Sequence, residues 1–283
     1  MVFNWNDIWL YLFGLVGVIY TLTIVFTLIV VILENRSPQK TISWILVLIL
    51  LPIIGLISYL VFGQSYRKQK MFSLKGLGDL KWLQILSQDQ KGKLEKNKFL
   101  KNERIHEKKN VMTLLLNNSK AILTGQNRVK ILNDGEETFK EIYNALRKAN
   151  EHIHLEYYII EDGELASELL EILIERANAG VEVRIIYDGV GSWKLSQEYI
   201  DSLREAGVKI HAFLPVRFPI LTSRINYRNH RKIIIIDGKT AFVGGLNFAD
   251  RYKNGIPNIG AWRDTHLKIV GEAASSLQIV FLI

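Results

Sequence analysis

The chain lacks cysteine altogether, so none of its 283 residues can form a disulfide or act as a thiolate. This absence fits a domain that faces the cytoplasm. The six histidines form no cluster with the spacing of metal ligands. We therefore expect no metal and no other cofactor.

Charge is also missing from two long stretches near the N-terminus. The first, from Ile8 to Leu33, and the second, from Thr41 to Phe62, contain no charged residue. A bilayer core needs about 20 apolar residues, so each run predicts a transmembrane helix, the second one kinked or loosened at Pro52 and Gly55. The alternatives are a cleaved signal peptide and a buried soluble helix pair. The length of the first run and the second run that follows it favour the membrane.

The net charge of +8 is concentrated just after these runs. The stretch from Gly63 to Asn110 holds thirteen Lys or Arg and five Asp or Glu. Because the segment after the second run is more basic than the loop before it, the positive-inside rule predicts a multi-pass protein of the cell membrane with its C-terminal part in the cytoplasm. The basic stretch either contacts anionic lipid headgroups or is a solvated linker; nucleic-acid binding is a weaker alternative, and we expect no nucleic acid as a partner.

From about residue 127 onward, strand patterns alternate with helix patterns. Asp134 followed by Glu137 predicts a helix N-cap, and Asp237-Gly238 predicts a hairpin turn. The alternation predicts an α/β sandwich with a largely buried sheet. Three parts are expected: a membrane anchor over 1–63, a basic juxtamembrane linker over 64–126, and the α/β domain over 127–283. Strands are expected at 127–133, 152–160, 181–189, 208–214, on both sides of 237–238 and at 262–271, and helices from 134, at 165–178, at 196–206 and from 272.

One stretch, NHRKIIIIDG at residues 229–238, sets polar groups into an apolar strand. Side chains alternate along a strand, so His230 and Lys232 point the same way, while Asp237 lies in the turn. Gly244, Gly245 and Asn247 follow after the turn. The glycines allow close approach of the backbone and Asn247 offers an amide donor. An imidazole, a cation and an amide are the groups needed to hold a phosphate and attack it; the alternative is an ordinary edge histidine before a type I′ turn.

The pattern HxKxxxxD followed by GGxN resembles the signature of the phospholipase D superfamily. Within it, the chain looks most like the bacterial cardiolipin synthases. The segments that carry this resemblance are SPQKTISWILVLILLPIIGLISYLVFG, HIHLEYYII, YDGVGS, NHRKIIIIDGKTAFVGGLN and WRDTHLKIVG. The resemblance covers essentially the whole chain, but only about the first half of a family member.

The resemblance implies a role for each residue of the motif. His230 would be the nucleophile or general acid, Lys232 and Asn247 would hold phosphate oxygens, and Asp237 would tie down the hairpin. Asp264 occupies the place of the acid that orients the histidine. For three further residues, His266, Glu156 and Tyr157, structural packing is favoured over a role in the site.

The implied reaction makes cardiolipin and glycerol from two molecules of phosphatidylglycerol through a phosphatidyl-histidine. It needs two motifs, and only His230 lies in one here. We therefore expect a C-terminally truncated half of a phospholipase D-like domain pair. Three interpretations remain: a half that is inactive alone, a homodimer acting as a phospholipase or phosphodiesterase, or a remnant that binds anionic membrane lipid. The acceptor alcohol stays open.

Overall fold

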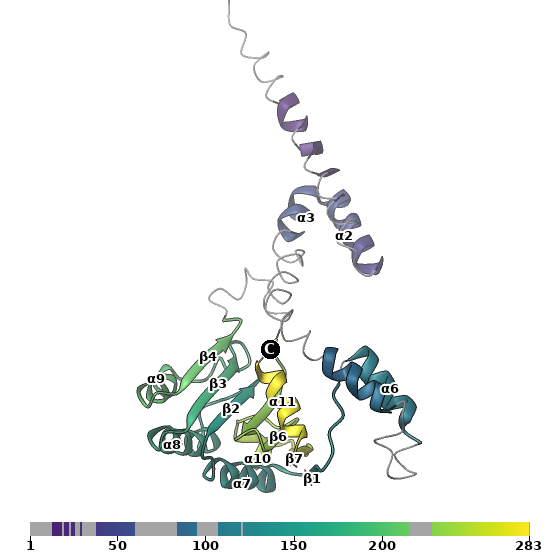
Figure 1. Cartoon of the computed structure of the whole chain (residues 1–283). Coiled ribbons are helices and arrows are strands. Elements are labelled where there is room, and N and C mark those ends of the chain that lie inside the picture. The colour runs from purple at the N-terminus through teal and green to yellow at the C-terminus, as the bar shows by residue number, and fades with distance from the viewer. Residues whose placement is uncertain are drawn as a thin grey trace, which may run out of the picture. The chain divides into compact units, whose positions relative to one another are not determined.

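The computed structural model describes residues 13–18, 20–22, 24–25, 29, 38–59, 84–94, 107–119, 121–215 and 228–282. Contacts within the chain separate two compact units. One comprises residues 1–74 with 218–223, and the other comprises 75–217 with 224–283. Figure 1 shows the elements of both units.

In the first unit, the second uncharged run is divided between two helices. Helix α2 covers Pro38–Leu50 and α3 covers Pro52–Ser58, with Leu51 between them in a non-helical conformation. The single helix predicted over Thr41–Phe62 is therefore wrong, because Pro52 breaks the helix instead of kinking it. Part of the predicted run Ile8–Leu33 lies outside the described residues. Nowhere in the described part of the chain does a helix combine the length and apolarity needed to cross a membrane.

The second unit is built on a mixed sheet of seven strands in the order β1-β7-β6-β5-β2-β3-β4. Strands β2, β3 and β4 pair in parallel, and the remaining pairs are antiparallel. The α/β sandwich that the sequence predicts is confirmed, with every predicted strand present. The strands are β1 (Arg128–Leu132), β2 (His152–Tyr157), β3 (Glu182–Asp188), β4 (Lys209–Phe213), β5 (Lys232–Ile236), β6 (Thr240–Gly244) and β7 (His266–Val270).

Helices cover both faces of this sheet. The Asp134 side chain accepts a hydrogen bond from the Glu137 N–H and begins one of them, as predicted. A short helix after Asp250 was not predicted, because four residues give no periodic signal. Helices α7 (Gly135–Leu146), α8 (Glu164–Asn178) and α9 (Gln197–Glu205) cover one face, and α11 (Ala273–Leu282) covers the other. The unit also contains α6 (Lys109–Asn118), α10 (Arg251–Asn254) and a helical segment at 84–94.

The isoleucine run of β5 supplies both cores. Ile234 and Ile236 belong to the main core, together with residues of α7, α8 and α9. Ile233 and Ile235 belong to a smaller core that includes Ala274 and Phe281 of α11. Because neighbouring side chains leave opposite faces of a strand, four consecutive apolar residues fit a strand that is covered on both sides.

The basic stretch predicted as a linker over 64–126 contains helical structure where it is described. Residues 84–94 are helical, and α6 follows. The Gln90 side chain donates to the Leu123 carbonyl (2.9 Å) and accepts from the Leu123 N–H (2.7 Å). The first helix is thereby joined to the segment that leads into β1.

A tight turn joins β5 to β6. Asp237 and Gly238 both have positive φ (52° and 62°), and the Lys239 N–H donates to the Ile236 carbonyl at 3.1 Å. These are the features of the type I′ turn that Asp-Gly favours. The Asp237 carboxylate leaves the turn and accepts the backbone N–H groups of Asn150, Glu151 and His152 at 2.8–3.3 Å. It thus fixes the hairpin to the start of β2. Burial acts to raise the Asp237 pKa, but these donors outweigh it and lower the pKa.

We expect Asp237→Ala to destabilise the second unit by about 3 kcal/mol, since three N–H groups lose a charged acceptor and alanine disfavours positive φ. Asp237→Asn should destabilise the unit clearly less, because asparagine tolerates positive φ and keeps one side-chain oxygen as an acceptor. Urea unfolding of the full chain in mild detergent measures both. Because its pKa is lowered in the fold, the Asp237 contribution is present above the unfolded value of 3.8 and should disappear as pH falls through the folded pKa. Equal stability of the two variants would contradict the assignment.

Candidate active site

The motif lies where the end of β2 meets the start of β5. These strands are antiparallel, and Tyr157 at the end of β2 is paired with Lys232 at the start of β5. His230 precedes Lys232 by two residues and is exposed. The sheet register therefore brings the residues that follow β2 beside the motif.

Tyr158 contacts both His230 and Lys232. The Tyr158 and His230 rings stack with centroids 3.7 Å apart and an interplanar angle of 20°. The Lys232 Nζ lies 5.3 Å from the centroid of the same tyrosine ring and donates to the His230 carbonyl at 2.8 Å. The sequence did not point to Tyr158, and it favoured a packing role for its neighbour Tyr157, which the structure confirms. Tyr157 is packed in the core, with its ring centroid 4.6 Å from that of Phe248.

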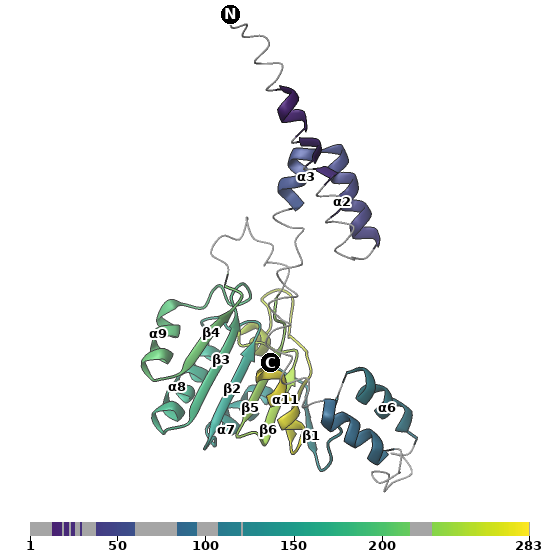
Figure 2. The same ribbon diagram turned by 45° about the horizontal axis from the view of Figure 1, so that its top comes forward.

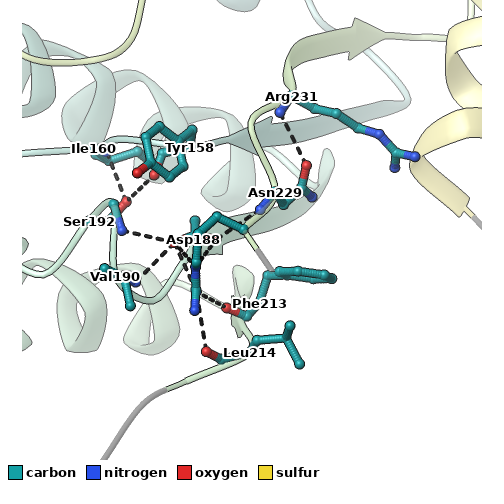
Figure 3. A network of polar contacts seen from close by, with 11 residues as sticks. Tyr158, Ile160, Asp188, Val190, Ser192, Phe213, Leu214, Asn229 and Arg231 are labelled. Carbon is teal, nitrogen blue, oxygen red and sulfur yellow. Dashed lines mark hydrogen bonds and ion pairs between the residues drawn. The ribbon is translucent and has the colours of Figure 1, made fainter. Parts of the chain in front are cut away.

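A buried carboxylate at the end of β3 holds the chain just before His230 (Figure 3). Both Asp188 oxygens accept from the Arg228 Nε at 2.9 Å, and one accepts from the Asn229 N–H at 3.0 Å. The other also accepts from the N–H groups of Val190 (3.0 Å) and Gly191 (2.8 Å). The side chains of Asp188 and Arg228 are 0% and 7% exposed. This ion pair therefore lies in the protein interior, where it is screened little by water.

The same arginine also reaches the end of β4. Arg228 Nη2 donates to the carbonyls of Phe213 (3.1 Å) and Leu214 (3.2 Å). Asp188 and Arg228 together connect β3, β4 and the segment that leads into His230. The sequence contains no spacing signal for this pair, because 40 residues separate its members.

The loop after β3 packs against Tyr158 and holds its backbone. Ser192 Oγ donates to the Tyr158 carbonyl (3.2 Å) and accepts from the Ile160 N–H (3.0 Å). A Cβ at Gly191 would lie 2.2 Å from the Tyr158 carbonyl oxygen and under 3 Å from its ring. Only glycine fits there. Because Asp188 binds the Gly191 N–H, the anchor of the motif also anchors the tyrosine against which His230 packs.

Glu156 contacts the residues on either side of His230. Its Oε1 accepts from Asn229 Nδ2 and lies 3.4 Å from Arg231 Nη1, and its side chain is 4% exposed. The sequence favours a packing role for Glu156 over a role in the site. The structure places this carboxylate on the face of β2 toward α11 and in contact with the motif.

Asn247 is nearly enclosed by the protein. Its Oδ1 accepts from the Ile159 N–H (3.1 Å) and its Nδ2 donates to the Tyr252 hydroxyl (2.7 Å). An amide nitrogen has two N–H donors, and among the described residues only one of them has an acceptor. The amide thereby also ties the segment after β6 to the segment after β2.

The segment leading into β7 brings Asp264 against the end of β6. A Cβ on Gly245 would lie 2.2 Å from the Asp264 carboxylate, and one on Gly244 would lie 2.5 Å from the His266 ring. The two glycines thus allow close approach, here by side chains of the same chain. The Asp264 Oδ1 accepts from the Thr265 N–H at 2.7 Å. Between Asp264 and the His230 ring, the described part of the chain shows no hydrogen bond.

Burial and neighbouring charges shift the pKa values around this cluster. Burial lowers the pKa of Lys232, and the Asp264 carboxylate opposes this. Burial also lowers the pKa of His266 to about 4, opposed by Asp264 and reinforced by Lys232. His266 therefore stays neutral at neutral pH, beside a carboxylate and an ammonium group.

Comparison with known proteins identifies the family. Residues 142–264 match the family described as "Cardiolipin synthase, PLD-like domain", and residues 22–64 match the one described as "Phospholipase D-nuclease N-terminal". The chain is 46% identical over 273 residues to "Cardiolipin synthase" from Halalkalibacterium halodurans, covering 95% of this chain and 53% of the relative. The chain belongs to the cardiolipin synthase family.

Other family members give the same extent of coverage. "Cardiolipin synthase" from Geobacillus sp. is 44% identical over 282 residues, which is 99% of this chain and 55% of that protein. The chain thus spans about half the length of the curated relatives that it matches. Among solved structures, the phospholipase D family member Nuc from Salmonella typhimurium aligns with a TM-score of 0.42 and 18% identity, over 55% of this chain and 92% of that one.

We expect Asp188→Asn to destabilise the second unit by about 3–5 kcal/mol, because it removes the buried carboxylate that pairs with the Arg228 guanidinium. Asp201→Asn is the matched control. Asp201 pairs with Arg204 on an exposed helix face, where loss of the pair should cost less than about 1 kcal/mol. Urea unfolding of the two variants beside the unmodified chain measures the difference. Similar decreases in the free energy of unfolding would show that the buried pair stabilises the fold no more than the exposed pair does.

Acid should destabilise the fold through its buried histidines. Burial lowers the pKa of His266 and also that of His154 to about 4, against 6.5 when unfolded. The unfolded chain then binds more protons below pH 6.5, so stability should fall from pH 6.5 toward pH 4. His266→Leu should reduce the slope by up to one proton, about 1.4 kcal/mol per pH unit, and His211→Gln, at an exposed position, should not. An unchanged slope of stability against pH in the His266→Leu variant would show that His266 is not a source of the acid sensitivity.

Proposed function

We propose that this chain supplies one of two histidine centres of a phosphatidyltransferase that makes cardiolipin and glycerol from two phosphatidylglycerol molecules. The observation that carries the proposal is the exposed His230 with Lys232 at its side, within a chain that is 46% identical to a cardiolipin synthase. Because the sequence holds a single HxKxxxxD motif, we propose that the second centre comes from outside residues 1–283.

His230 is the proposed nucleophile. Its ring face packs against Tyr158, which leaves the ring edge and its nitrogens directed elsewhere. No side chain or backbone group in the described ranges makes a hydrogen bond to these nitrogens. A nitrogen of His230 attacks the phosphorus of phosphatidylglycerol, and the N–P bond forms as the P–O bond to glycerol breaks. The second histidine donates the proton with which glycerol leaves.

The second step reverses these roles. A hydroxyl group of another phosphatidylglycerol attacks the phosphatidyl-histidine, and the second histidine takes its proton. Cardiolipin forms and His230 is released unchanged. Another acceptor would change the product: water would give phosphatidic acid, the reaction of a phospholipase.

We propose that Lys232, which contacts His230, and Asn247 hold the phosphate oxygens. Lys232 is partly buried, so its ammonium group interacts more strongly with an anion than a fully solvated one would. One amide N–H of Asn247 has no acceptor among the described residues. Fixed donors of this kind stabilise charge that develops on the oxygens during transfer. Asp264 favours the charged form of Lys232, and we propose that it also orients His230 once substrate is bound.

The substrate determines where the enzyme works. Phosphatidylglycerol remains in the bilayer, so we propose that residues 1–63 attach the chain to the cell membrane with the catalytic unit on the cytoplasmic side. Anionic lipid is then both substrate and surface. A second copy of the chain, with its own His230, is one possible source of the second centre. The other is a segment equivalent to the part of the relatives that this chain does not cover.

The test uses the full chain in phosphatidylglycerol vesicles, with mass spectrometry of the lipids and of protein quenched in denaturant at neutral pH, because acid hydrolyses an N–P bond. We expect cardiolipin, free glycerol and a phosphatidyl adduct on His230. His230→Ala should reduce product at least about 10³-fold, as expected for loss of a nucleophile. The matched control His211→Ala, at an exposed position, should keep full activity.

The outcomes separate the candidates. Phosphatidic acid in place of cardiolipin would favour a phospholipase formed by two copies. An adduct on His230 with free glycerol, but without cardiolipin or phosphatidic acid, would show that a second copy does not complete the second step. A folded chain with neither adduct nor product would show that two copies do not form the site, and it would favour a half that is inactive alone or a protein that only binds lipid.

A further inference from the structure

The uncharged run after residue 40 folds back on itself. Leu51, between α2 and α3, has φ −135° and ψ 68°, and Pro52 is the first residue of α3. Proline lacks the N–H that would continue the helix, and it disfavours helical geometry in the residue before it. The break is therefore encoded locally, at the middle of the run.

The two helices pack as an antiparallel pair, visible side by side in Figure 2. A Cβ on Gly55 would lie 2.8 Å from the Val47 carbonyl oxygen, so only glycine allows the backbones this close. Farther from the turn, the rings of Trp44 and Tyr59 meet edge to face with centroids 5.3 Å apart. Later residues of α3 thus contact earlier residues of α2, which defines a hairpin.

The outside of this hairpin is apolar, including its tip. Leu50 and Leu51, on either side of the turn, are 73% and 52% exposed. The sequence has no charged residue from Thr41 through Phe62. A contiguous exposed apolar surface of this kind marks an interaction site. Other apolar residues on the outer surface of the two helices are Ile42, Leu46, Ile49 and Ile54.

Charge identifies the partner. In the sequence, basic residues flank both ends of the uncharged run: Arg36 and Lys40 before it, and Arg67, Lys68 and Lys70 after it. In an antiparallel pair, the start of α2 and the end of α3 lie at the same end, opposite the tip. An uncharged hairpin with basic residues on both sides of it in the sequence matches one leaflet of an anionic bilayer, whose headgroups attract each nearby Lys or Arg by about 1 kcal/mol.

We propose that α2 and α3 form a re-entrant hairpin, which inserts tip first into one leaflet and returns to the side from which it entered. With 13 residues, α2 is about 20 Å long, against about 30 Å for the hydrocarbon core. The inference rests on the proposed function for the presence of a bilayer but not for any catalytic step. A re-entrant hairpin would put the basic residues before and after the uncharged run on the same side of the membrane. The positive-inside rule is then satisfied by both groups together.

The absence of cysteine makes the test direct, because each introduced thiol is the only one in the chain. Three single variants are made: Gln39→Cys near the start of α2, Gln64→Cys five residues beyond Tyr59, and Glu205→Cys on an exposed position of α9 as the marker for the catalytic unit. Each is treated with a membrane-impermeant maleimide in spheroplasts and in inverted vesicles.

We expect all three variants to react from the same side. Reaction of Gln39→Cys and Gln64→Cys from opposite sides would overturn the hairpin in favour of a single span. Labelling needs no turnover, so this outcome is independent of whether cardiolipin is made. Loss of activity with same-side labelling would count against the proposed function alone.

Depth is tested separately at the tip. Leu51→Cys carrying an environment-sensitive fluorophore should be quenched by lipids with a nitroxide in the acyl chain and protected from iodide in water. Strong quenching by iodide with none from the lipid would place the tip outside the bilayer and overturn the proposal. The Glu205→Cys variant with the same fluorophore is the control that iodide should reach.

Discussion

The position of His230 depends on one buried carboxylate. Asp188 binds the Arg228 side chain and the Asn229 N–H immediately before it, and through Gly191 it also fixes the loop under Tyr158. A charge in the interior is stable only when its partners are complete, so this arrangement is all or none. The histidine can therefore stay exposed while the backbone that carries it is held rigidly.

The other end of β5 is fixed by a second carboxylate. Asp237 binds three backbone N–H groups at the start of β2, and Asp188 acts through the residues just before β5. A strand with isoleucine on both faces has strong apolar packing but little that specifies its position along its neighbour. The two carboxylates supply that specification. This explains why the polar positions of the motif lie at its ends and not within the isoleucine run.

Local patterns made most of the second unit predictable. The Asp134 cap, the Asp-Gly turn and the apolar spacing of each strand act within a few residues, and the structure confirms them. The support of the site was not predictable, because the Asp188–Arg228 pair and the Tyr158–His230 stack join residues 40 and 72 positions apart. Their partners depend on sheet order, which no local pattern states. The break at Pro52 was noticed, but its consequence depends on how Gly55 packs against α2.

The polar face of β2 shows what this arrangement costs. His154 and Glu156 are buried on the side toward α11, and within the described residues His154 Nε2 and Glu156 Oε2 have no hydrogen-bond partner. A buried polar atom without a partner costs about 1–3 kcal/mol, and an apolar residue would remove that cost. Yet the other Glu156 oxygen binds Asn229, next to His230. The strand that would be most stable as a wholly apolar one instead carries a carboxylate to the motif. Stability of the sheet and placement of the histidine are thus opposing demands on the same strand.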